Sequence, residues 1–351
     1  MISPALLSIV RCPACQGALG GSPSFLTCAA CGHTYASESA DFLDLRPHDA
    51  FSERTKYLDP ALHADARYEQ VSAPFLGSKI RNDMLRAFLA PSPSDRVVDL
   101  GCGSGRALLW NRDWRAAAVG VDISPFFAAD ARRDADLLLG DLRRLPFGDG
   151  AFTRAYSLDV LEHLSPDALR GVLREAARVL APGGRLFVYT HVRKNARIAV
   201  ALRWINRFAE RLDRAGLIDL RQEHLRKSDH LNPLADIPEL RRVAAACGFR
   251  IVRIRYYTPI VGGLVENVLM RIAEQRLARR ARRAEHCTMS DANALKAARR
   301  AGKARVAASR STRAALRALT LAMKLDLLLF GRVESGPFFA LLERTAAGSG
   351  R

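Results

Sequence analysis

Between residues 95 and 190, short apolar runs alternate with segments whose apolar residues recur at helical spacing. Strand-like runs separated by helical segments are typical of an α/β fold with a parallel sheet. Ahead of this region, Ser78–Ala90 places its apolar side chains on one helical face, and Pro91 closes that helix. We therefore predict a doubly wound sheet with helices on both faces, preceded by a lead-in helix.

The same pattern divides the chain into four predicted parts. Residues 1–46 are compact and carry two close cysteine pairs, whereas residues 47–94 are a polar linker followed by the lead-in helix. Residues 95–258 hold the α/β domain, and residues 259–351 form a basic and then apolar helical extension. Because a domain of about 40 residues buries little apolar surface, a bound metal would substitute for a core in the first part.

The cysteine pairs are of the form Cys-x-x-Cys, at Cys12 and Cys15 and at Cys28 and Cys31. In a reducing compartment such pairs are metal ligands rather than disulfides. Four thiolates at this spacing suit a closed tetrahedral zinc site, which leaves no coordination position for a substrate. The sequence therefore predicts a zinc ribbon whose metal is structural.

A glycine-rich turn follows the strand-like run Val97–Leu100, and a helical segment begins at Arg106. The turn has the spacing Gly-x-Gly-x-Gly over Gly101–Gly105, which lets the backbone approach a nucleoside-bearing ligand closely. Two further strand-like runs end in the acids Asp122 and Asp141. In a doubly wound fold, the first of these stands where a carboxylate binds ribose hydroxyls.

These motifs resemble those of the class I S-adenosylmethionine (SAM)-dependent methyltransferases, in particular their UbiE-like branch. The similarity covers about residues 70–258, with the motifs in the order and spacing of that family. The residues that carry it are Val98–Gly105, Gly120–Asp122, Gly140–Leu142, Val160–Leu164 and Arg178–Gly184. The resemblance implies a Rossmann-like methyltransferase sheet, SAM as the cofactor and an enzyme of the transferase class.

The resemblance also implies which residues contact the methionine part of SAM. Gly101, Gly103 and Gly105 should pass under this part of the cofactor, and Asp99 should lie toward its amino group. The alternative for Asp99 is ordinary capping at the end of its strand.

The nucleoside and the methyl group have their own implied partners. Asp122 should bind the ribose hydroxyls, and Asp141 should accept a hydrogen bond from the adenine amino group. Leu142 should donate its backbone amide to the adenine ring. Ser157 and Leu158 should line the floor toward which the sulfonium methyl points.

Methyl transfer is a direct displacement at the sulfonium carbon, for which SAM supplies the activation. The protein must align the nucleophile and remove its proton where it carries one. His163 and His191 follow strands at the edge where open α/β sheets bind ligands, which makes them candidate catalytic bases. His224 and His230 lie in the segment that would cap the site. The alternatives are a structural role for His163 and a solvated helix face for the last two.

The formal net charge is +18, which indicates an acidic partner or reflects a bias toward arginine. The basic segment Arg276–Arg305 is followed by the apolar run Leu319–Phe330. This combination suits binding to an anionic membrane surface, binding to RNA phosphates, or a helical appendage that packs on the domain. We find no secretory signal and no apolar run of the roughly 18–20 residues that span a membrane. We therefore expect a cytoplasmic protein, either free or peripheral to the inner face of the membrane.

The ribbon is similar to the small zinc-ribbon proteins that partner methyltransferases, and to the N-terminal ribbon of bacterial ribosomal-RNA guanine methyltransferases. Besides its cysteines, Gly32, Tyr35 and the exit Asp41–Leu45 carry this likeness. Those RNA enzymes end soon after the sheet, whereas this chain continues through residues 259–351, which weakens the case for an RNA substrate.

We therefore expect methyl transfer from SAM to an oxygen, nitrogen or carbon nucleophile of a small-metabolite, glycan or lipid-linked acceptor. Two alternatives stay open. One is a ribosomal or transfer RNA methyltransferase, and the other is a catalytically silent SAM-binding partner module.

Overall fold

The structure is a computed structural model of the chain. It describes residues 2–47, 58, 71–192, 199–218, 220, 230–231, 233–257, 260–284, 300–302, 304–306 and 308–345.

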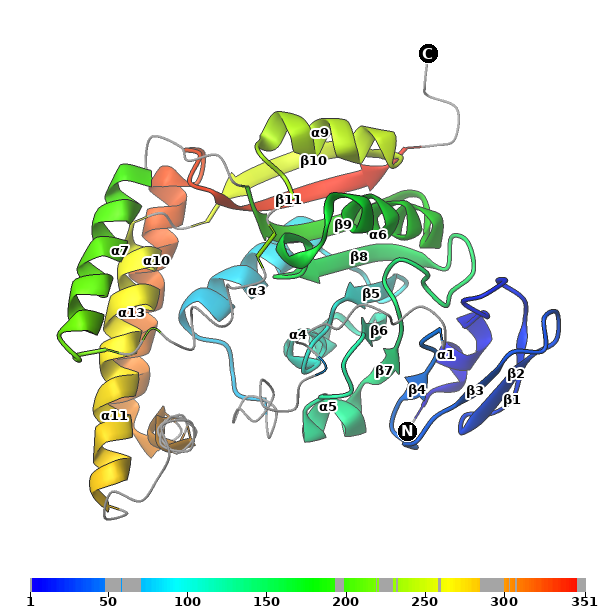
Figure 1. Ribbon diagram of the computed structural model, residues 1–351, viewed down its shortest axis with the longest axis horizontal. Helices are drawn as coiled ribbons and strands as arrows, with labels where there is room; N and C mark the ends of the chain where they lie inside the picture. The colour runs from blue at the N-terminus through cyan, green and yellow to red at the C-terminus, as the bar shows by residue number, and fades with distance from the viewer. Residues whose placement is uncertain are drawn as a thin grey trace.

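The N-terminal ribbon consists of one short helix and a three-stranded antiparallel sheet (Figure 1). Helix α1 (Pro4–Ile9) begins at Ser3, whose hydroxyl accepts a hydrogen bond from the backbone N–H of Leu6. This cap, followed by proline, is a typical start for a helix. The strands are β1 (Leu19–Ser22), β2 (Phe25–Cys28) and β3 (Thr34–Ala36).

An eight-stranded sheet forms the centre of the molecule, in the order β10-β11-β9-β8-β5-β6-β7-β4. Strand β11 runs antiparallel to both of its neighbours, and the other described pairings are parallel. The strands are β4 (Leu43–Asp44), β5 (Arg96–Leu100), β6 (Ala117–Asp122), β7 (Asp136–Leu139), β8 (Phe152–Leu158), β9 (Leu180–His191), β10 (Phe249–Tyr256) and β11 (Pro337–Arg344).

Helices cover both faces of this sheet, which confirms the predicted doubly wound architecture. Alternate residues of β9 show the two layers: Leu186 and Val188 belong to one apolar core, Phe187 and Tyr189 to the other. Helices α6 (Pro166–Val179) and α9 (Ile237–Ala246) contribute to the first core, and α3 (Leu76–Leu89) to the second. The other helices of this part are α4 (Arg106–Trp110), α5 (Ala129–Asp134) and the 3₁₀ turns η3 (Arg112–Trp114) and η4 (Leu161–His163).

Strand β11 departs from the predicted division of the chain. Residues 337–344 were expected in the helical extension that follows residue 258, yet they form a strand between β9 and β10. The run Phe338–Leu342 is buried on both faces of the sheet and shows no polar alternation. A strand covered on both sides reads as a continuous apolar run, which periodicity cannot distinguish from a buried helix.

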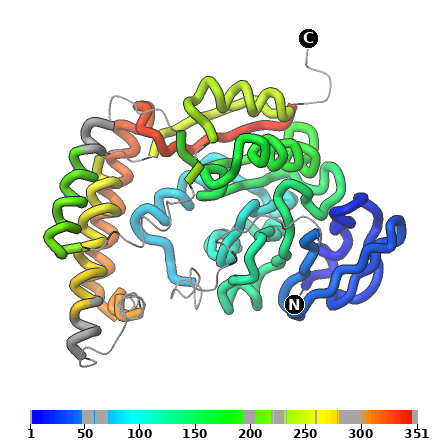
Figure 2. Tube along the Cα trace, viewed as in Figure 1, coloured from blue at the N-terminus to red at the C-terminus, as the bar shows by residue number. Residues whose placement is uncertain are grey.

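The helices between β10 and β11 therefore form an excursion from the sheet, and with α7 (Ala199–Arg214) we call them the helical arm. They are α10 (Val261–Leu264), the π-helical turn η5 (Val265–Leu269), α11 (Met270–Ala284) and α13 (Arg310–Phe330). Figures 1 and 2 show these helices side by side, projecting from one side of the sheet. Helix α13 packs on α3, where Thr320 accepts a hydrogen bond from the N–H of Leu76.

Among the described residues, no helix is both long enough and apolar enough to cross a membrane.

Candidate functional site

The glycine-rich turn lies between β5 and α4, at the carboxyl end of the sheet. The N–H groups of Gly101 and Cys102 both donate to the carbonyl of Val121 at the end of β6. Gly101 has a φ of +83°, and a Cβ there would stand 2.4 Å from a methyl group of Val160. Gly103 has a φ of +53°, but a Cβ there would meet nothing within 4 Å. The turn is thus packed on one side and open at Gly103, where a ligand could approach the backbone.

Asp99 lies next to this turn and is almost fully buried, with 2% of its surface exposed. Burial raises the pKa of its carboxyl group well above the ordinary value, and Tyr156 and Arg106 offset only part of this effect. A buried carboxyl group in such surroundings favours the arrival of a cation. This is the environment expected for a residue that receives the amino group of SAM.

Asp122 connects the end of β6 to the glycine-rich turn. Its Oδ2 accepts a hydrogen bond from the N–H of Gly103 at 2.7 Å, and its Oδ1 accepts one from the N–H of Ser124 at 2.9 Å. Burial raises the pKa of this carboxyl group, although the two amides lower it in part. The carboxylate therefore stands beside the open side of the turn, next to Gly103.

Asp141 stands one strand further along the edge, directly after β7 and Gly140. Its carboxylate is buried and pairs with the Arg143 guanidinium at 2.9 Å, while the Arg143 N–H also donates to it at 2.8 Å. Leu142, the expected amide donor to adenine, is partly buried beside it. The Asp141 carboxylate thus already pairs with Arg143 on one side. The sequence motifs did not predict this ion pair.

Ser157 and Leu158 end strand β8, beside the glycine-rich turn. The hydroxyl of Ser157 is buried and donates a hydrogen bond to the carbonyl of Leu100 at 2.8 Å. This bond ties β8 to β5 at the point where the turn begins. Leu158 is partly buried against the second core.

The two candidate bases, His163 and His191, come together with Glu162 and His230, and we call these four residues the histidine cluster. His163 and His230 have ring centroids 4.5 Å apart, and those of His191 and His230 are 5.9 Å apart. Nδ1 of His191 lies 3.4 Å from Oε1 of Glu162. Burial raises the pKa of Glu162, but His191 outweighs it and leaves that pKa below its ordinary value. His224 lies outside the described residues.

A second polar group at this edge was missed by the sequence analysis. Asp159, in the left-handed region with a φ of +58°, lies 3.8 Å from the guanidinium of Arg81. That guanidinium is 5.3 Å from the ring centre of Tyr189, and the hydroxyl of Tyr257 donates to Glu266 at 3.0 Å. Arg81 could not be found, because α3 meets the sheet only in the folded chain.

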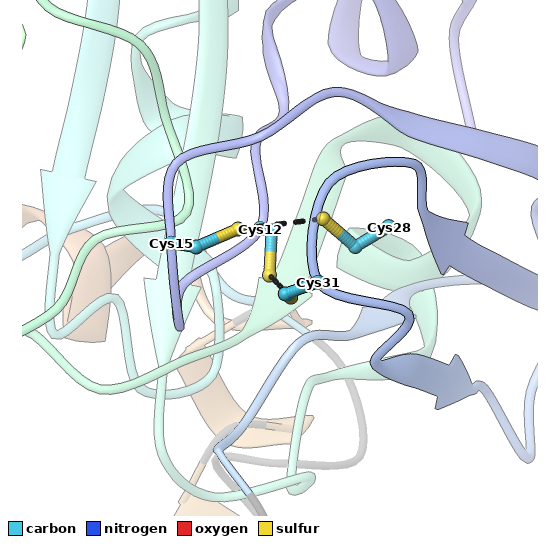
Figure 3. A group of neighbouring side chains, drawn as sticks. All are labelled: Cys12, Cys15, Cys28 and Cys31. Atoms are coloured by element: carbon cyan, nitrogen blue, oxygen red, sulfur yellow. Dashed lines mark hydrogen bonds between the residues drawn. The ribbon is translucent and has the colours of Figure 1, made fainter.

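The four ribbon cysteines gather as predicted, with the sulfur atoms of the two pairs facing each other (Figure 3). Their sulfurs lie within 4.8 Å of one another, with 3.7 Å between Cys12 and Cys31 and 3.4 Å between Cys15 and Cys28. Zn–S bonds of about 2.3 Å in a tetrahedron require sulfurs about 3.8 Å apart. The four thiols therefore fit a tetrahedral metal.

The ribbon packs directly on the segment that follows Asp141. The N–H of Arg11 donates to the carbonyl of Pro146 at 2.9 Å, and Val10 forms a bridge with Phe147. Leu6 and Val10 share one apolar core with Phe147 and the main sheet. The ribbon consequently shares its core with the α/β domain. Figure 1 shows the ribbon next to β4 and β7 at the edge of the sheet.

Comparison with known proteins agrees with this fold. Residues 98–188 match the family model described as a methyltransferase domain. A demethylmenaquinone methyltransferase of Mycolicibacterium vanbaalenii is 41% identical over 108 residues, which are 29% of this chain and 45% of the relative. A protein named probable tRNA methyltransferase 9B from Mus musculus is 32% identical over 131 residues, 36% of this chain and 29% of its own length. The chain thus spans less than half of either relative.

A solved structure shows the same fold. Phosphoethanolamine N-methyltransferase 2 of Haemonchus contortus, in complex with SAM, has a TM-score of 0.50 and 16% identity, covering 83% of this chain and 58% of that one. Residues 98–188 therefore match a methyltransferase domain, and the glycine-rich turn lies inside the matched residues.

Proposed function

We propose that this protein transfers a methyl group from SAM to an oxygen, nitrogen or carbon nucleophile of a small-metabolite, glycan or lipid-linked acceptor. The observation that carries the proposal is the open side of Gly103, which lies beside Asp122 within the methyltransferase domain. A backbone turn of this kind accepts a nucleoside-bearing ligand at the carboxyl edge of the sheet.

The residues around the turn suit the parts of SAM in order. Asp99 would face the amino group, Asp122 the ribose, and Asp141 and Leu142 the adenine. Gly101, Gly103 and Gly105 would lie under the methionine part, with Ser157 and Leu158 as the floor. When bound, SAM supplies a methyl group on a positively charged sulfur, which is activated for direct displacement.

The histidine cluster would handle the proton of the acceptor. His163 and His191 lie at the edge of the sheet beside the turn, and Oε1 of Glu162 lies 3.4 Å from Nδ1 of His191. A base at hydrogen-bond distance from the nucleophile typically contributes 10²–10⁴-fold to the rate. We assign the proton to one of these two histidines.

The helical arm supports an apolar acceptor. On α13 the exposed side chains at helical spacing are Leu321, Leu325, Leu328 and Leu329. These leucines suit a hydrocarbon chain or a membrane surface better than RNA, whose binding rests on phosphate charges and stacked bases. The net charge and the similarity to the protein named as a tRNA methyltransferase favour the RNA alternative.

We further propose that the ribbon binds one structural zinc ion through Cys12, Cys15, Cys28 and Cys31. The fit of their sulfur positions to a tetrahedron supports this, and four thiolates fill the coordination sphere.

The test is transfer of labelled methyl from SAM into a cell extract that is afterwards separated into organic-solvent, aqueous small-molecule and RNA fractions. We expect label in the organic-solvent or small-molecule fraction with wild-type protein and little with Asp122→Asn. The matched control is Asp167→Asn, since that carboxylate is 97% exposed and lies in α6. Label in the RNA fraction would overturn the acceptor class, and no label in any fraction would support a silent module.

A further inference from the structure

The histidine cluster has the geometry of a metal site as well as that of a proton relay. One ligand atom each of Glu162, His163 and His230 lies within 4.8 Å of the other two. His191 lies beside this group without being part of it, with its Nδ1 3.4 Å from Oε1 of Glu162. These residues come from η4, the end of β9 and a separate segment at residue 230, so the fold assembles them from three places.

Glu162 supplies the buried carboxylate of the histidine cluster. The residue is 1% exposed, and its Oε2 accepts a hydrogen bond from the hydroxyl of Thr190 at 3.0 Å. Its Oε1 is buried, and among the described residues its polar neighbour is Nδ1 of His191 at 3.4 Å, a contact that does not meet hydrogen-bond geometry. A buried carboxylate oxygen without a hydrogen-bond donor carries a free-energy cost. A cation bonded to Oε1 would remove that cost.

We propose that Glu162, His163 and His230 bind a divalent transition-metal ion of the zinc class, with His191 beside it. Imidazole nitrogens with one carboxylate are the ligands of Zn²⁺, Fe²⁺ and Co²⁺, whereas Mg²⁺ and Ca²⁺ take oxygen ligands. Thr190 fixes the carboxylate from behind, as the hydrogen-bond partners of metal ligands usually do. In contrast to the closed four-cysteine site, three ligands leave a coordination position open.

Because the histidine cluster lies near the SAM turn, the open coordination position could bind the methyl acceptor. This role rests on the proposed function. Val160, three residues before His163, packs against Gly101 of the SAM turn. An acceptor hydroxyl bound to the metal would become acidic and would pass its proton to His191, the candidate base that is not a metal ligand. The oxygen then attacks the methyl carbon, a new C–O bond forms, the C–S bond breaks, and the sulfur of S-adenosylhomocysteine keeps the electron pair.

Counting bound metal on the full chain tests the site. Wild-type protein, the double variant His163→Ala/His230→Ala, and the control His33→Ala are dialysed against buffered Zn²⁺ with a thiol reductant. His33 is exposed beside Cys31 of the ribbon, so the control loses a histidine away from the edge. We expect wild type and control to retain one equivalent of zinc more than the double variant. SAM binding shows that each variant is folded.

The proposal is overturned if the double variant retains as much zinc as wild type. A conservative variant adds a second test. Thr190→Val should weaken zinc binding at the histidine cluster about 10–100-fold and leave the ribbon metal in place. The experiment distinguishes failure of the metal-site proposal from failure of the proposed methyltransferase function. Methyl transfer without the extra equivalent would refute the metal site alone, whereas the extra equivalent without any methyl transfer would refute the enzymatic function alone.

Discussion

The ribbon and the helical arm both border the same sheet, but they are joined to it in different ways. The ribbon shares an apolar core with the sheet and exchanges backbone hydrogen bonds with residues 146–147. The arm contacts α3 through α13, yet Leu328 and Leu329 at the end of α13 are each 70% exposed. The difference indicates that the ribbon belongs to the folding unit, whereas the arm offers surface to something outside it.

The largest expected effect follows from the shared core. Cys28→Ser removes one buried thiol of the ribbon and should lower the free energy of unfolding of the whole domain by at least about 3 kcal/mol, because binding of the proposed zinc would be part of folding. Urea unfolding measures it. Cys247→Ala is the control, since it removes a buried thiol outside the ribbon and should lose about 1 kcal/mol. Equal losses for the two variants would contradict the comparison.

Affinity at the proposed SAM site should depend on the carboxylates beside the glycine-rich turn. Asp122→Asn removes a charged acceptor beside Gly103, and a charge-assisted hydrogen bond is worth about 1.5–3 kcal/mol. We expect the Kd for SAM to rise about 10–100-fold by calorimetry, with Asp167→Asn unchanged. An unchanged Kd in the first variant would mean that Asp122 only ties β6 to the turn.

A pH series sharpens the role of Asp99. Burial raises the pKa of its carboxyl group, so in the free protein it is protonated below that raised pKa and charged above it. If the ammonium group of SAM pairs with the carboxylate, binding tightens as pH rises, by up to about tenfold per pH unit below that pKa. Asp99→Asn should flatten this dependence. A wild-type profile that is already flat would remove Asp99 from the site.

The smallest effect is expected on the arm. The double variant Leu325→Arg/Leu329→Arg changes two exposed side chains and should leave unfolding and SAM affinity within about 0.5 kcal/mol of wild type. Transfer to an apolar acceptor should fall several-fold in a liposome-supported assay. Leu217→Arg, at an exposed leucine beyond α7, serves as control. Equal rates in all three proteins would leave the leucines of α13 without a role in acceptor binding.

Local patterns predicted what lies close in sequence. Runs of a few residues predicted strand β5, the glycine-rich turn after it and the acids at the ends of β6 and β7. The structure places all of them along one edge of the sheet. The cysteine pairs were equally local, since each pair lies on one turn of the ribbon.

Contacts between distant segments could not be read in the same way. Strand β11, which contains Phe338–Leu342, pairs with β9 and β10, and this pairing is not visible in the local sequence. His230 meets His163, and Arg81 meets Asp159, through tertiary packing that spacing does not encode. The salt bridge from Arg143 to Asp141 is local, but the sequence does not show which way the arginine turns.

The central claim is SAM-dependent methyl transfer, and the most direct test is a balance of its two products. S-adenosylhomocysteine released and label incorporated into the acceptor fraction are measured together with full-length protein. The account predicts equal amounts of both, with each lost in Asp122→Asn. SAM that is bound and later recovered unchanged, with neither product formed in any acceptor fraction, would contradict it.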